Sequence, residues 1–587
     1  MCGITGYVGG RNATEVLFEM LKRLEYRGYD SAGIAYVTEN GIRVPKDRGA
    51  VSAVEKSLDL KGVSSNIGVG HTRWATHGAP SQINSHPHPD CTGDFVVAHN
   101  GIIENYIQLK SELEELGHKF KSETDTEVVA HLIEQYYDGD LLNALEKTLA
   151  RLQGSYALTV LSSKHLDRIL VARLKSPMII GFGVGEMFVA SDAPAFMKYT
   201  KKVHIMRDGE YGEITKDGAV IFNDGKKISV KAQELDWSVE AAEKGGFPHF
   251  MLKEIMEEPA SAEHALTSIA KISEVAKKIA KKKRIMFVAC GTAYHAGMVG
   301  KYVLENFGVE AEAEVASEFR YSTAKTVNQD TALIVVSQSG ETADTLAAIE
   351  EAKNKGAYVL GIVNVVGSSI TRVADDTVYI QSGPEIAVAS TKAYIGQSIL
   401  TTLLALHIAF SKEFISKDKL DGFLREAKSL PGKIQKILSD NNLKSLAEKC
   451  ANTRTFFYIG RTLNYPTALE GALKIKEIAY VHAEGYAAGE LKHGPLAVLD
   501  EETVVIAIKS GKNLSDKMDS NIQEAKARRA TVLTVAEYGD IKVPETVDEL
   551  TPILNIVPLH LFAYYISDLK GLDPDKPRNL AKSVTVE

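Results

Sequence analysis

The sequence has few cysteines and no long run of purely apolar residues. Its 587 residues include four cysteines, at positions 2, 91, 290 and 450, and they form neither a CxxC zinc pattern nor a disulfide framework. We therefore expect a reducing, cytoplasmic compartment, with Cys91, Cys290 and Cys450 as small packing residues. No apolar run reaches the roughly 18 residues that span a bilayer. A signal peptide, with a basic stretch followed by an apolar one, is also not found.

An excess of positive charge is also lacking. The chain has 68 basic and 76 acidic residues, for a formal net charge of -8, whereas nucleic-acid binders usually carry a basic face. This balance still allows a small anionic substrate, because one phosphate needs only a local pocket. With 44% hydrophobic and 25% charged residues, the composition is that of a soluble globular protein. At this length we expect two to four domains.

The first 235 residues consist of short apolar runs separated by glycines, interrupted by two amphipathic segments at 13–25 and 104–117. Strands, then helices, then more strands indicate an α+β sandwich rather than a βαβ alternation. The strands are expected at residues 3–10, 67–70, 95–98, 155–161, 168–172 and 187–190. We assign residues 2–235 to one domain and 236–250, a charged glycine-containing stretch, to a linker.

The second half alternates strand and helix, which is typical of a parallel, doubly wound sheet covered by helices on both faces. Expected strands at 284–289, 332–337 and 359–363 alternate with helices at 293–307 and 342–354. The pattern recurs with strands at 455–459, 503–508 and 531–535 and helices at 466–482 and 515–529. We expect two copies of one α/β unit, at 280–410 and 450–575, followed by a tail at 576–587.

Cys2 is a candidate nucleophile. Removal of Met1 would place a thiol and a free α-amine on one residue. With a pKa near 8, the α-amine is unprotonated often enough to act as a general base for the thiol, without a histidine. A cysteine can also occur at position 2 by chance, so this residue alone does not establish a catalytic nucleophile.

Further polar blocks accompany Cys2, in this order: residues 2–4, 26–33, 71–78, 86–88, 99–105 and 122–127. Together they resemble the class II glutamine amidotransferases of the N-terminal-nucleophile superfamily. The resemblance extends over about the first 235 residues and implies a four-layer α+β sandwich that hydrolyses the side-chain amide of glutamine.

Such hydrolysis needs a nucleophile and two donors for the tetrahedral oxyanion. The resemblance implies Cys2 as the nucleophile, with the Asn100 amide and the Gly101 N–H as the donors. A bidentate cation suits the α-carboxylate of glutamine, and a carboxylate suits its α-amine. The matching positions are Arg73 and Asp125, with Thr76, His77 and His86 lining the same pocket.

Five histidines in this half, at positions 71, 77, 86, 88 and 99, could instead suggest a metal site. Metal-binding histidines usually recur at short fixed spacing with acidic partners, whereas residues 86–88 suit an extended loop. We therefore expect no metal and no cofactor.

The segment Ser337–Thr342 follows an expected buried strand and opens a helix. Hydroxyls and free N–H groups at a helix N-terminus, with a glycine for close approach, bind phosphate. The segment is neither a Walker loop nor a dinucleotide fingerprint. With residues 290–292 after the preceding strand, it resembles the sugar-isomerase (SIS) domain, whose ligands lie beyond the carboxyl ends of the strands.

In the second copy, the spacing of Glu470, Lys474 and Glu477 places them on one helix face. Either a solvated salt-bridged face or a catalytic group fits this pattern. With residues 490–495 and 577–587, the segment resembles the isomerase half of the glutamine–fructose-6-phosphate aminotransferase (isomerizing) family. That resemblance runs along the full chain.

The resemblance implies the following sugar chemistry. His493 would open the fructose ring, Lys582 would form a Schiff base at C2, and Glu477 would move a proton between C1 and C2. Lys474 would assist near the enolate and Glu470 would orient the sugar. The remaining contacts would come from Thr292, Ser337, Gln338, Ser339, Thr342 and Ser390. Ala293 and the turn 460–462 depart from the family pattern, and we expect them to adjust affinity only.

The family also implies a shielded ammonia path gated by Trp74, a homodimer, and the first step of hexosamine and UDP-N-acetylglucosamine synthesis. Other enzyme classes are alternatives. A deglycase or an isomerase without ammonia transfer would need no glutaminase half. A phosphoribosyl-pyrophosphate amidotransferase needs an acidic pyrophosphate motif and asparagine synthetase an SGGxD loop, and neither is found. A sugar-phosphate-sensing regulator built on SIS domains would require a helix-turn-helix module and a basic face.

Overall fold

A computed structural model describes residues 2–58, 60, 62–74, 77–230, 232–234, 244–440, 442–509 and 514–585. The chain divides into two compact units, residues 1–239 with 581–587, and residues 240–580. Residues 236–243 of the expected linker lie outside the described residues.

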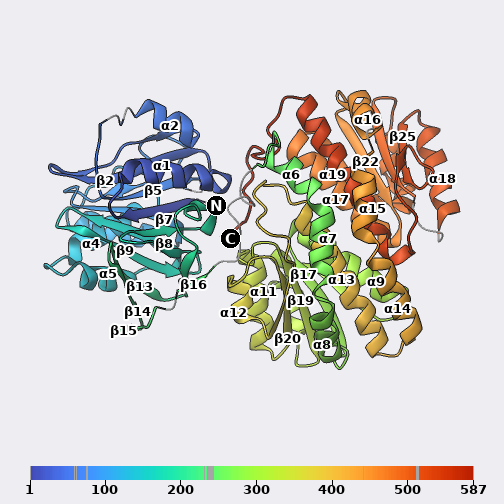
Figure 1. The fold of residues 1–587 in the computed structure, drawn as a ribbon, viewed down its shortest axis with the longest axis horizontal. Coiled ribbons are helices and arrows are strands. Elements are labelled where there is room, and N and C mark those ends of the chain that lie inside the picture. Colours follow the sequence, from blue (N-terminus) through green and yellow to red (C-terminus); the bar gives the residue numbers. More distant parts are fainter. Residues whose placement is uncertain are drawn as a thin grey trace. The chain divides into compact units, whose positions relative to one another are not determined.

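The first unit contains two stacked, largely antiparallel sheets (Figure 1). In the first sheet the path is β16 (Gln233–Glu234), β12 (Lys202–Ile205), β10 (Ile179–Phe182), β11 (Met187–Ala190), β1 (Gly3–Val8), β5 (Ile67–Arg73), β2 (Ser31–Thr38) and β3 (Gly41–Arg43), with β4 (Lys46–Arg48) paired to β2. The second follows β15 (Lys226–Lys227), β14 (Gly218–Asn223), β13 (Glu210–Thr215), β9 (His165–Leu174), β8 (Gly154–Ser162), β7 (Phe95–Ile103) and β6 (His88–Pro89).

Helices cover the outer faces of these sheets and complete the expected four-layer sandwich. Helices α1 (Ala13–Leu24) and α2 (Val51–Ser57) lie on the first sheet, and α3 (Tyr106–Glu115), α4 (Glu127–Tyr136) and α5 (Leu141–Leu149) on the second. The two sheets share an apolar core that includes Ile4, Val69, Val96, Val171 and Val189. The sequence pattern identified α1 and α3 but missed α4 and α5.

The second unit contains two parallel sheets with the same strand order, 2-1-3-4-5. The first is β18 (Glu312–Val315), β17 (Arg284–Ala289), β19 (Thr331–Ser337), β20 (Tyr358–Val363) and β21 (Asp376–Tyr379). The second is β23 (His482–Ala487), β22 (Thr455–Gly460), β24 (Thr503–Ile508), β25 (Thr531–Ala536) and β26 (Ile541–Lys542). The expected internal repeat is therefore present as a repeated topology, with a switch point between its first and third strands.

Helices cover both faces of these sheets. On the first sheet, α11 (Ala343–Asn354) and α12 (Ser369–Val373) lie opposite α8 (Ile269–Ile279) and α13 (Lys392–Ser411) (Figure 1). On the second, α18 (Ser515–Lys526) lies opposite α17 (Tyr465–Ala479) and α19 (Thr551–Leu569). The other helices are α6 (Phe250–Met256), α7 (Glu258–Leu266), α9 (Gly291–Asn306), α10 (Ala316–Phe319), α14 (Lys417–Ala427), α15 (Leu430–Leu438) and α16 (Asn442–Cys450).

The helix expected at 466–482 ends earlier. Tyr480 takes a left-handed conformation (φ 54°) and stops α17 at Ala479, so His482 starts strand β23 instead. A residue in this conformation commonly ends a helix, although glycine is more usual there.

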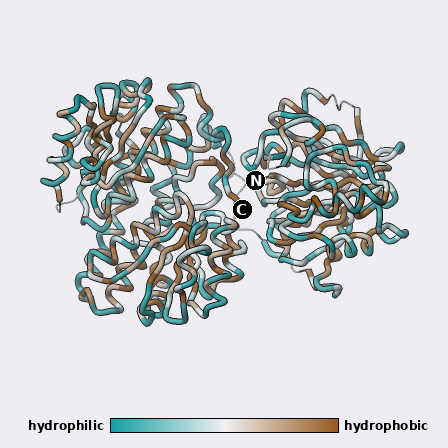
Figure 2. Tube along the Cα trace, turned by 180° about the vertical axis from the view of Figure 1, so that it is seen from behind, coloured by the Kyte–Doolittle hydropathy of each residue, from teal (hydrophilic) through white to brown (hydrophobic). Residues whose placement is uncertain are grey.

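The expectation that no apolar segment is long enough to span a bilayer needs correction for two helices. Lys392–Ser411 and Asp548–Leu569 are each long and apolar enough, by length and composition, to cross a membrane, yet 94% of each apolar window is buried inside the protein. Short polar side chains within them made the apolar runs look interrupted. Both helices belong to one apolar core that extends through the second unit, where brown, hydrophobic segments run through the interior (Figure 2).

Candidate active sites

Cys2 precedes the first strand, and its thiol lies against the backbone of Trp74, at the end of β5. The Trp74 N–H donates to Cys2 Sγ at 3.3 Å, and Sγ lies 3.5 Å from the Trp74 carbonyl oxygen. Burial raises the pKa of the Cys2 thiol, although the Trp74 N–H and the Arg73 guanidinium oppose this shift. The resting thiol is therefore neutral and needs a base before it can attack a substrate.

Two side chains fix the Cys2 carbonyl. Asn100 Nδ2 donates to it at 2.9 Å, and Arg27 Nε donates at 3.3 Å. Asn100 Nδ2 also donates to Ser191 Oγ at 2.9 Å, and that hydroxyl in turn accepts from the Ile4 N–H at 2.6 Å. Of these residues, the sequence singled out only Cys2 and Asn100 for a role.

A buried histidine sets the orientation of the Asn100 amide. His71 Nε2 lies 2.9 Å from the His99 carbonyl oxygen and 3.0 Å from Asn100 Oδ1. A carbonyl can only accept, so Nε2 carries the proton and donates to both oxygens. This bond directs the NH2 group of Asn100 toward Cys2 and makes His71 a positioning residue.

Gly101 occupies a position that excludes a side chain. Its φ is +127°, and an added Cβ would lie 2.1 Å from the Ser155 carbonyl oxygen. Both the left-handed conformation and the clash require glycine. Gly101 follows Asn100 on β7, and its role as an oxyanion donor stays a prediction.

Arg73 and Asp125 are both buried, with 3% and 4% exposure. Arg73 Nη2 donates to the carbonyl oxygens of His77 and Gly78, while the buried Nη1 makes no hydrogen bond to any described residue. Asp125 Oδ2 accepts from the Ile103 N–H at 2.8 Å. A buried guanidinium nitrogen with an open donor suits a carboxylate ligand. Thr76 lies outside the described residues.

His86 lies in a cluster of buried imidazoles behind this site. Its ring stacks on His71, with ring centroids 4.1 Å apart, and meets His88 edge-on at 4.6 Å. Its Nδ1 accepts from the His99 N–H at 3.4 Å. His77, by contrast, is half-buried and lies edge-on against Tyr106, with centroids 5.5 Å apart. His86 therefore supports the strands, whereas His77 stays accessible.

The buried histidines predict an acid-sensitive first unit. Burial lowers the pKa of His71 to about 3 and the pKa values of His86 and His88 well below the usual value. Unfolded histidines titrate near 6.5, so below that pH the unfolded chain binds more protons than the native one. Stability is present above pH 6.5 and falls as the pH drops toward 3. A histidine that stays neutral in the native state costs about 1.4 kcal/mol per pH unit below 6.5.

Trp74 belongs to the first unit, and the second tryptophan, Trp237, lies outside the described residues. In a Trp237→Phe background, thermal unfolding followed by the fluorescence of Trp74 therefore reports on the first unit. We expect the melting temperature to fall between pH 7 and pH 5, and to fall less steeply in His88→Asn. A melting temperature that stays constant over this range would contradict the assignment of neutral buried histidines.

In the second unit, the segment after β19 forms a tight turn into α11. Ser337 Oγ accepts from the Gly340 N–H at 3.0 Å and lies 3.3 Å from Thr342 Oγ1, while Ser339 Oγ accepts from the Glu341 N–H at 3.2 Å. Gly340 has φ +68°, and an added Cβ would lie 2.0 Å from Ser368 Oγ. The side chain of the N-cap residue Thr342 makes no capping hydrogen bond to the first turn of α11. Hydroxyls therefore surround a helix N-terminus whose N–H groups can receive an anion.

The connection from β17 into α9 contacts helix α17 of the second copy. Thr292 is the second residue of α9, after β17, and its Oγ1 donates to Glu470 Oε1 at 3.0 Å and accepts from Lys474 Nζ at 3.0 Å. The Thr292 hydroxyl thus connects the first SIS copy to helix α17 of the second. The sequence assigned Thr292 to substrate binding, a role that stays a prediction.

Helix α17 carries a buried charged network. Lys474 Nζ lies 3.3 Å from Glu470 Oε1 and 2.6 Å from Glu477 Oε2, and the side chains of Glu470 and Lys474 are fully buried. The sequence left open a solvated salt-bridged face, and the burial excludes it. His295 of α9, which the sequence missed, pairs through Nδ1 with Glu470 Oε2 at 2.7 Å.

Electrostatics hold this network charged. Burial opposes ionisation of Glu470, but Lys474 and His295 outweigh it and keep the pKa of Glu470 below its usual value. Burial likewise opposes the charge on Lys474, and the two carboxylates outweigh it and raise the Lys474 pKa. Glu477, whose side chain is 21% exposed, is the member that a ligand can reach.

The remaining predicted residues belong to other segments of the chain. Ser390 Oγ donates to Glu385 Oε2 at 2.7 Å, just before α13. His493 ends the 3₁₀ helix Ala488–His493, is exposed, and forms no hydrogen bond or ion pair through its ring with any described residue. Gln338 lies in the turn, where its carbonyl accepts from the Asn364 N–H at 3.3 Å. Lys582 belongs to the C-terminal segment that groups with the first unit.

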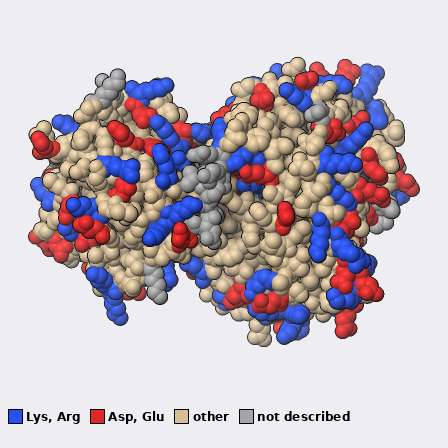
Figure 3. All heavy atoms as spheres, viewed as in Figure 1, with Lys and Arg blue, Asp and Glu red and all other residues tan. Residues whose placement is uncertain are grey.

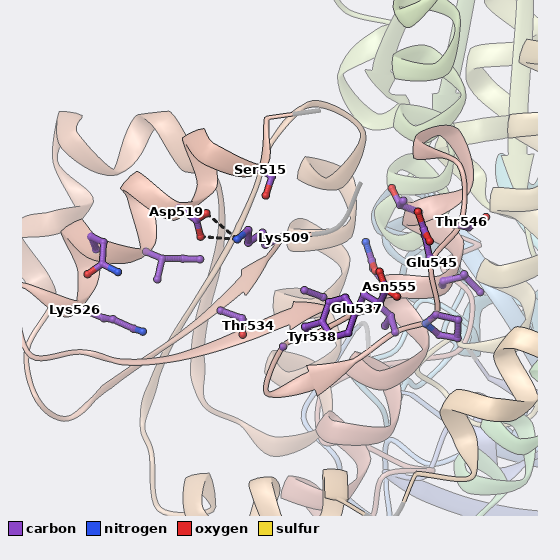
Figure 4. Close-up of a pocket in the computed structure, with 18 residues that line it drawn as sticks. Lys509, Ser515, Asp519, Lys526, Thr534, Glu537, Tyr538, Glu545, Thr546 and Asn555 are labelled. Carbon is purple, nitrogen blue, oxygen red and sulfur yellow. Dashed lines mark hydrogen bonds and ion pairs between the residues drawn. The ribbon is translucent and has the colours of Figure 1, made fainter. Parts of the chain in front are cut away.

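Two cavities lined by residues of the second SIS copy, one of them also by residues of α9, contain none of the predicted catalytic residues. One, of about 390 Å³, contains the Lys509–Asp519 ion pair, with Glu537, Tyr538 and Asn555 opposite it (Figure 4). The other, of about 320 Å³, lies at the second switch point beside Arg461 and Asn464. Basic and acidic side chains are intermixed on the visible face of each unit (Figure 3).

Comparison with known proteins identifies both halves. Residues 71–198 match the glutamine amidotransferase domain family, and residues 278–407 and 449–546 match the SIS domain family. The chain is 50% identical to the glutamine–fructose-6-phosphate aminotransferase (isomerizing) of Caldanaerobacter subterraneus and 49% identical to that of Pyrococcus horikoshii, covering 100% of each chain and of each relative.

A solved structure also resembles the second half. The C-terminal domain of glucosamine-fructose-6-phosphate aminotransferase from Francisella tularensis is 35% identical, with a TM-score of 0.54. The match covers 57% of this chain and 100% of that domain.

Proposed function

Because the chain belongs to the glutamine–fructose-6-phosphate aminotransferase (isomerizing) family, we propose that its two units divide one reaction between them. The enzyme converts D-fructose 6-phosphate and L-glutamine to D-glucosamine 6-phosphate and L-glutamate. Residues 2–235 form the glutaminase domain, 236–250 the linker, 280–410 and 450–575 the SIS domains, and 576–587 a tail that completes the isomerase site.

In the glutaminase domain, the α-amine of Cys2, exposed when Met1 is removed, takes the thiol proton. The thiolate attacks the glutamine amide, and the oxyanion is held by the Gly101 N–H and Asn100 Nδ2. Asn100 now donates to the Cys2 carbonyl, so this donor turns to the oxyanion when substrate binds. Arg73 Nη1 binds the α-carboxylate and Asp125 binds the α-amine. Thr76 and His77 border the pocket, and His86 supports its wall from the imidazole cluster behind it.

In the isomerase domain, Ser337, Gln338, Ser339 and Thr342 hold the phosphate at the N-terminus of α11. Thr292, Ser390 and Glu470 orient the sugar. His493 opens the ring, Lys582 forms a Schiff base with C2, and ammonia displaces the lysine. Glu477 then moves a proton from C1 to C2, while Lys474 stabilises the enolate-like charge. A single observation carries this proposal: a fully buried Glu470–Lys474 pair holds the partly exposed Glu477 at 2.6 Å.

Trp74 supports coupling between the two reactions, since both its backbone N–H and carbonyl contact Cys2 Sγ. We expect Trp74→Ala to keep glutamine hydrolysis within a few-fold of the parent. Its output of amino sugar from glutamine should fall roughly tenfold, because released ammonia escapes to water, is protonated and loses its nucleophilicity. Parallel assays of glutamate and glucosamine 6-phosphate measure this ratio. An equal loss of both products would count against a gate and an ammonia channel.

We further propose a cytoplasmic homodimer without metal-dependent chemistry, nucleic-acid partner or membrane anchor, acting at the first step of UDP-N-acetylglucosamine synthesis. The exposed His493 fits a site completed by a second subunit. Sedimentation should give twice the mass of one chain. Mixing His493→Ala with Glu477→Gln should restore part of the activity if sites are shared, and a monomer would contradict this arrangement.

The overall function is tested by incubating the full chain with glutamine and fructose 6-phosphate. Glutamate and glucosamine 6-phosphate are expected in equal amounts. Formation of glutamate without any amino sugar would support only the glutaminase activity and would contradict the proposed amination of fructose 6-phosphate.

A further inference from the structure

A second polar cluster lies in the first unit, away from Cys2. Its members come from three segments: Cys91 from the turn between β6 and β7, His118 from the loop after α3, and His131 and Glu134 from α4. One potential ligand atom from each of the four residues lies within 4.8 Å of the other three. The sequence treated Cys91 as a packing residue, which is wrong, because Cys91 is exposed and faces this cluster.

The separations match a tetrahedral metal site. Cys91 Sγ lies 3.8 Å from His118 Nδ1 and 3.5 Å from His131 Nδ1. Glu134 Oε2 lies 3.0 Å from His118 Nδ1 and 3.3 Å from His131 Nδ1. Zinc bonds of about 2.3 Å to sulfur and about 2.0–2.2 Å to nitrogen and oxygen place tetrahedral ligand atoms roughly 3.3–3.6 Å apart.

The far nitrogen of each imidazole faces an oxygen. His118 Nε2 lies 3.1 Å from Gln135 Oε1, and His131 Nε2 lies 3.6 Å from Glu127 Oε1. The Gln135 oxygen is within hydrogen-bond distance and can hold the proton of His118 on Nε2, which leaves the Nδ1 lone pair for a metal, as outer-shell partners do in zinc sites. The Glu127 oxygen lies at ion-pair distance from His131 and forms no hydrogen bond with it. The Lys119 N–H also donates to Cys91 Sγ at 3.3 Å, which suits a thiolate.

Several potential ligand atoms converge on the buried ring of His131, whose side chain is 1% exposed. Its Nδ1 lies 3.3 Å from Glu134 Oε2 and 3.5 Å from Cys91 Sγ, and the same carboxylate oxygen lies 3.0 Å from His118 Nδ1. One cation between these atoms would bind the thiolate, both imidazoles and the carboxylate at once.

We infer that Cys91, His118, His131 and Glu134 bind one zinc ion. A thiolate, two imidazoles and a carboxylate are a ligand set that zinc favours. Four protein ligands leave no open position for a substrate, so the role is structural. The ion ties two loops to α4, whose first residue, Glu127, follows Asp125 of the glutamine pocket by two positions. It therefore stiffens the element that positions Asp125.

Metal analysis of the full-length protein tests this assignment. Protein expressed with zinc and dialysed against a weak chelator should retain about one zinc per chain. Cys91→Ser and His118→Asn should lose it, while His165→Asn, a histidine of the same unit outside the cluster, should keep it. Gln135→Ala should weaken zinc binding by roughly 10–100-fold, because only the outer shell changes.

Cobalt substitution identifies the ligands. Metal-free protein titrated with Co²⁺ should develop a thiolate-to-cobalt charge-transfer band and the strong visible bands of tetrahedral cobalt, and Cys91→Ser should lack the charge-transfer band. A strong chelator should lower the fluorescence-detected melting temperature of the parent but not that of Cys91→Ser. Zinc content equally low in the parent and in Cys91→Ser, or cobalt spectra that Cys91→Ser leaves unchanged, would overturn the proposal.

Discussion

Replacing Cys2 by alanine is expected to abolish amino-sugar formation from glutamine, with a loss of about 10⁴-fold or more, because the covalent step disappears. The substitution removes only the sulfur atom among the heavy atoms of Cys2. The hydrogen bonds from Asn100 and Arg27 go to the Cys2 carbonyl, so the backbone of the site should remain in place. Steady-state formation of glutamate and glucosamine 6-phosphate measures the loss.

The same variant should still make glucosamine 6-phosphate when free ammonia replaces glutamine, because the second unit is unaltered. Cys450→Ser provides the matched control, since Cys450 packs in the core of the second unit. Continued glutamine-dependent synthesis by Cys2→Ala would show that another group releases the ammonia. Loss of the ammonia reaction as well would indicate general damage.

Replacing Lys474 by methionine is expected to stop isomerisation and to destabilise the second unit by about 3–5 kcal/mol. Lys474 is fully buried between Glu470 and Glu477. Methionine has a similar length and no charge, so the carboxylate of Glu470 is left buried, with His295 as its remaining ion-pair partner. Scanning calorimetry, with tryptophan fluorescence to identify the first unit, measures the shift. Glutamine hydrolysis at low temperature should persist.

Glu477→Gln separates the chemical role from the stability effect. Glutamine keeps the shape and removes the proton-transferring carboxylate, so we expect a loss of about 10²–10⁴-fold in isomerisation. The calorimetric transition should shift far less than in Lys474→Met, because Glu470 still neutralises the buried ammonium. Isomerase activity that survives in Glu477→Gln would remove this residue from the mechanism.

Local sequence patterns predicted much of the fold. Alternating strand and helix signals located β17, β19, β20, β22, β24 and β25 to within two residues, because parallel strands buried on both faces are continuous apolar runs. The local sequence pattern missed helices whose position depends on tertiary contacts. Helices α4 and α5 lie between polar loops and pack on the second sheet, and α13 carries threonines and a glutamine that its buried surroundings tolerate.

The sequence named candidate site residues but did not predict the contacts that support them. Ser191 reaches the Ile4 N–H across 187 residues, and His295 reaches Glu470 across 175. Neither pair has a local spacing signal, because each is created by folding. The zinc cluster shows the same limit: His131 and Glu134 share a helix face, but Cys91 is 40 residues away from His131.

Glutamine labelled with ¹⁵N in its side-chain amide tests the central claim most directly. The full-length enzyme is incubated with this glutamine, fructose 6-phosphate and excess unlabelled ammonium, and the amino sugar is analysed by mass spectrometry. Nitrogen released at Cys2 and delivered to the sugar predicts glucosamine 6-phosphate that carries ¹⁵N. Unlabelled glucosamine 6-phosphate, or labelled ammonium without any amino sugar, would contradict a chain that joins glutamine hydrolysis to the amination of fructose 6-phosphate.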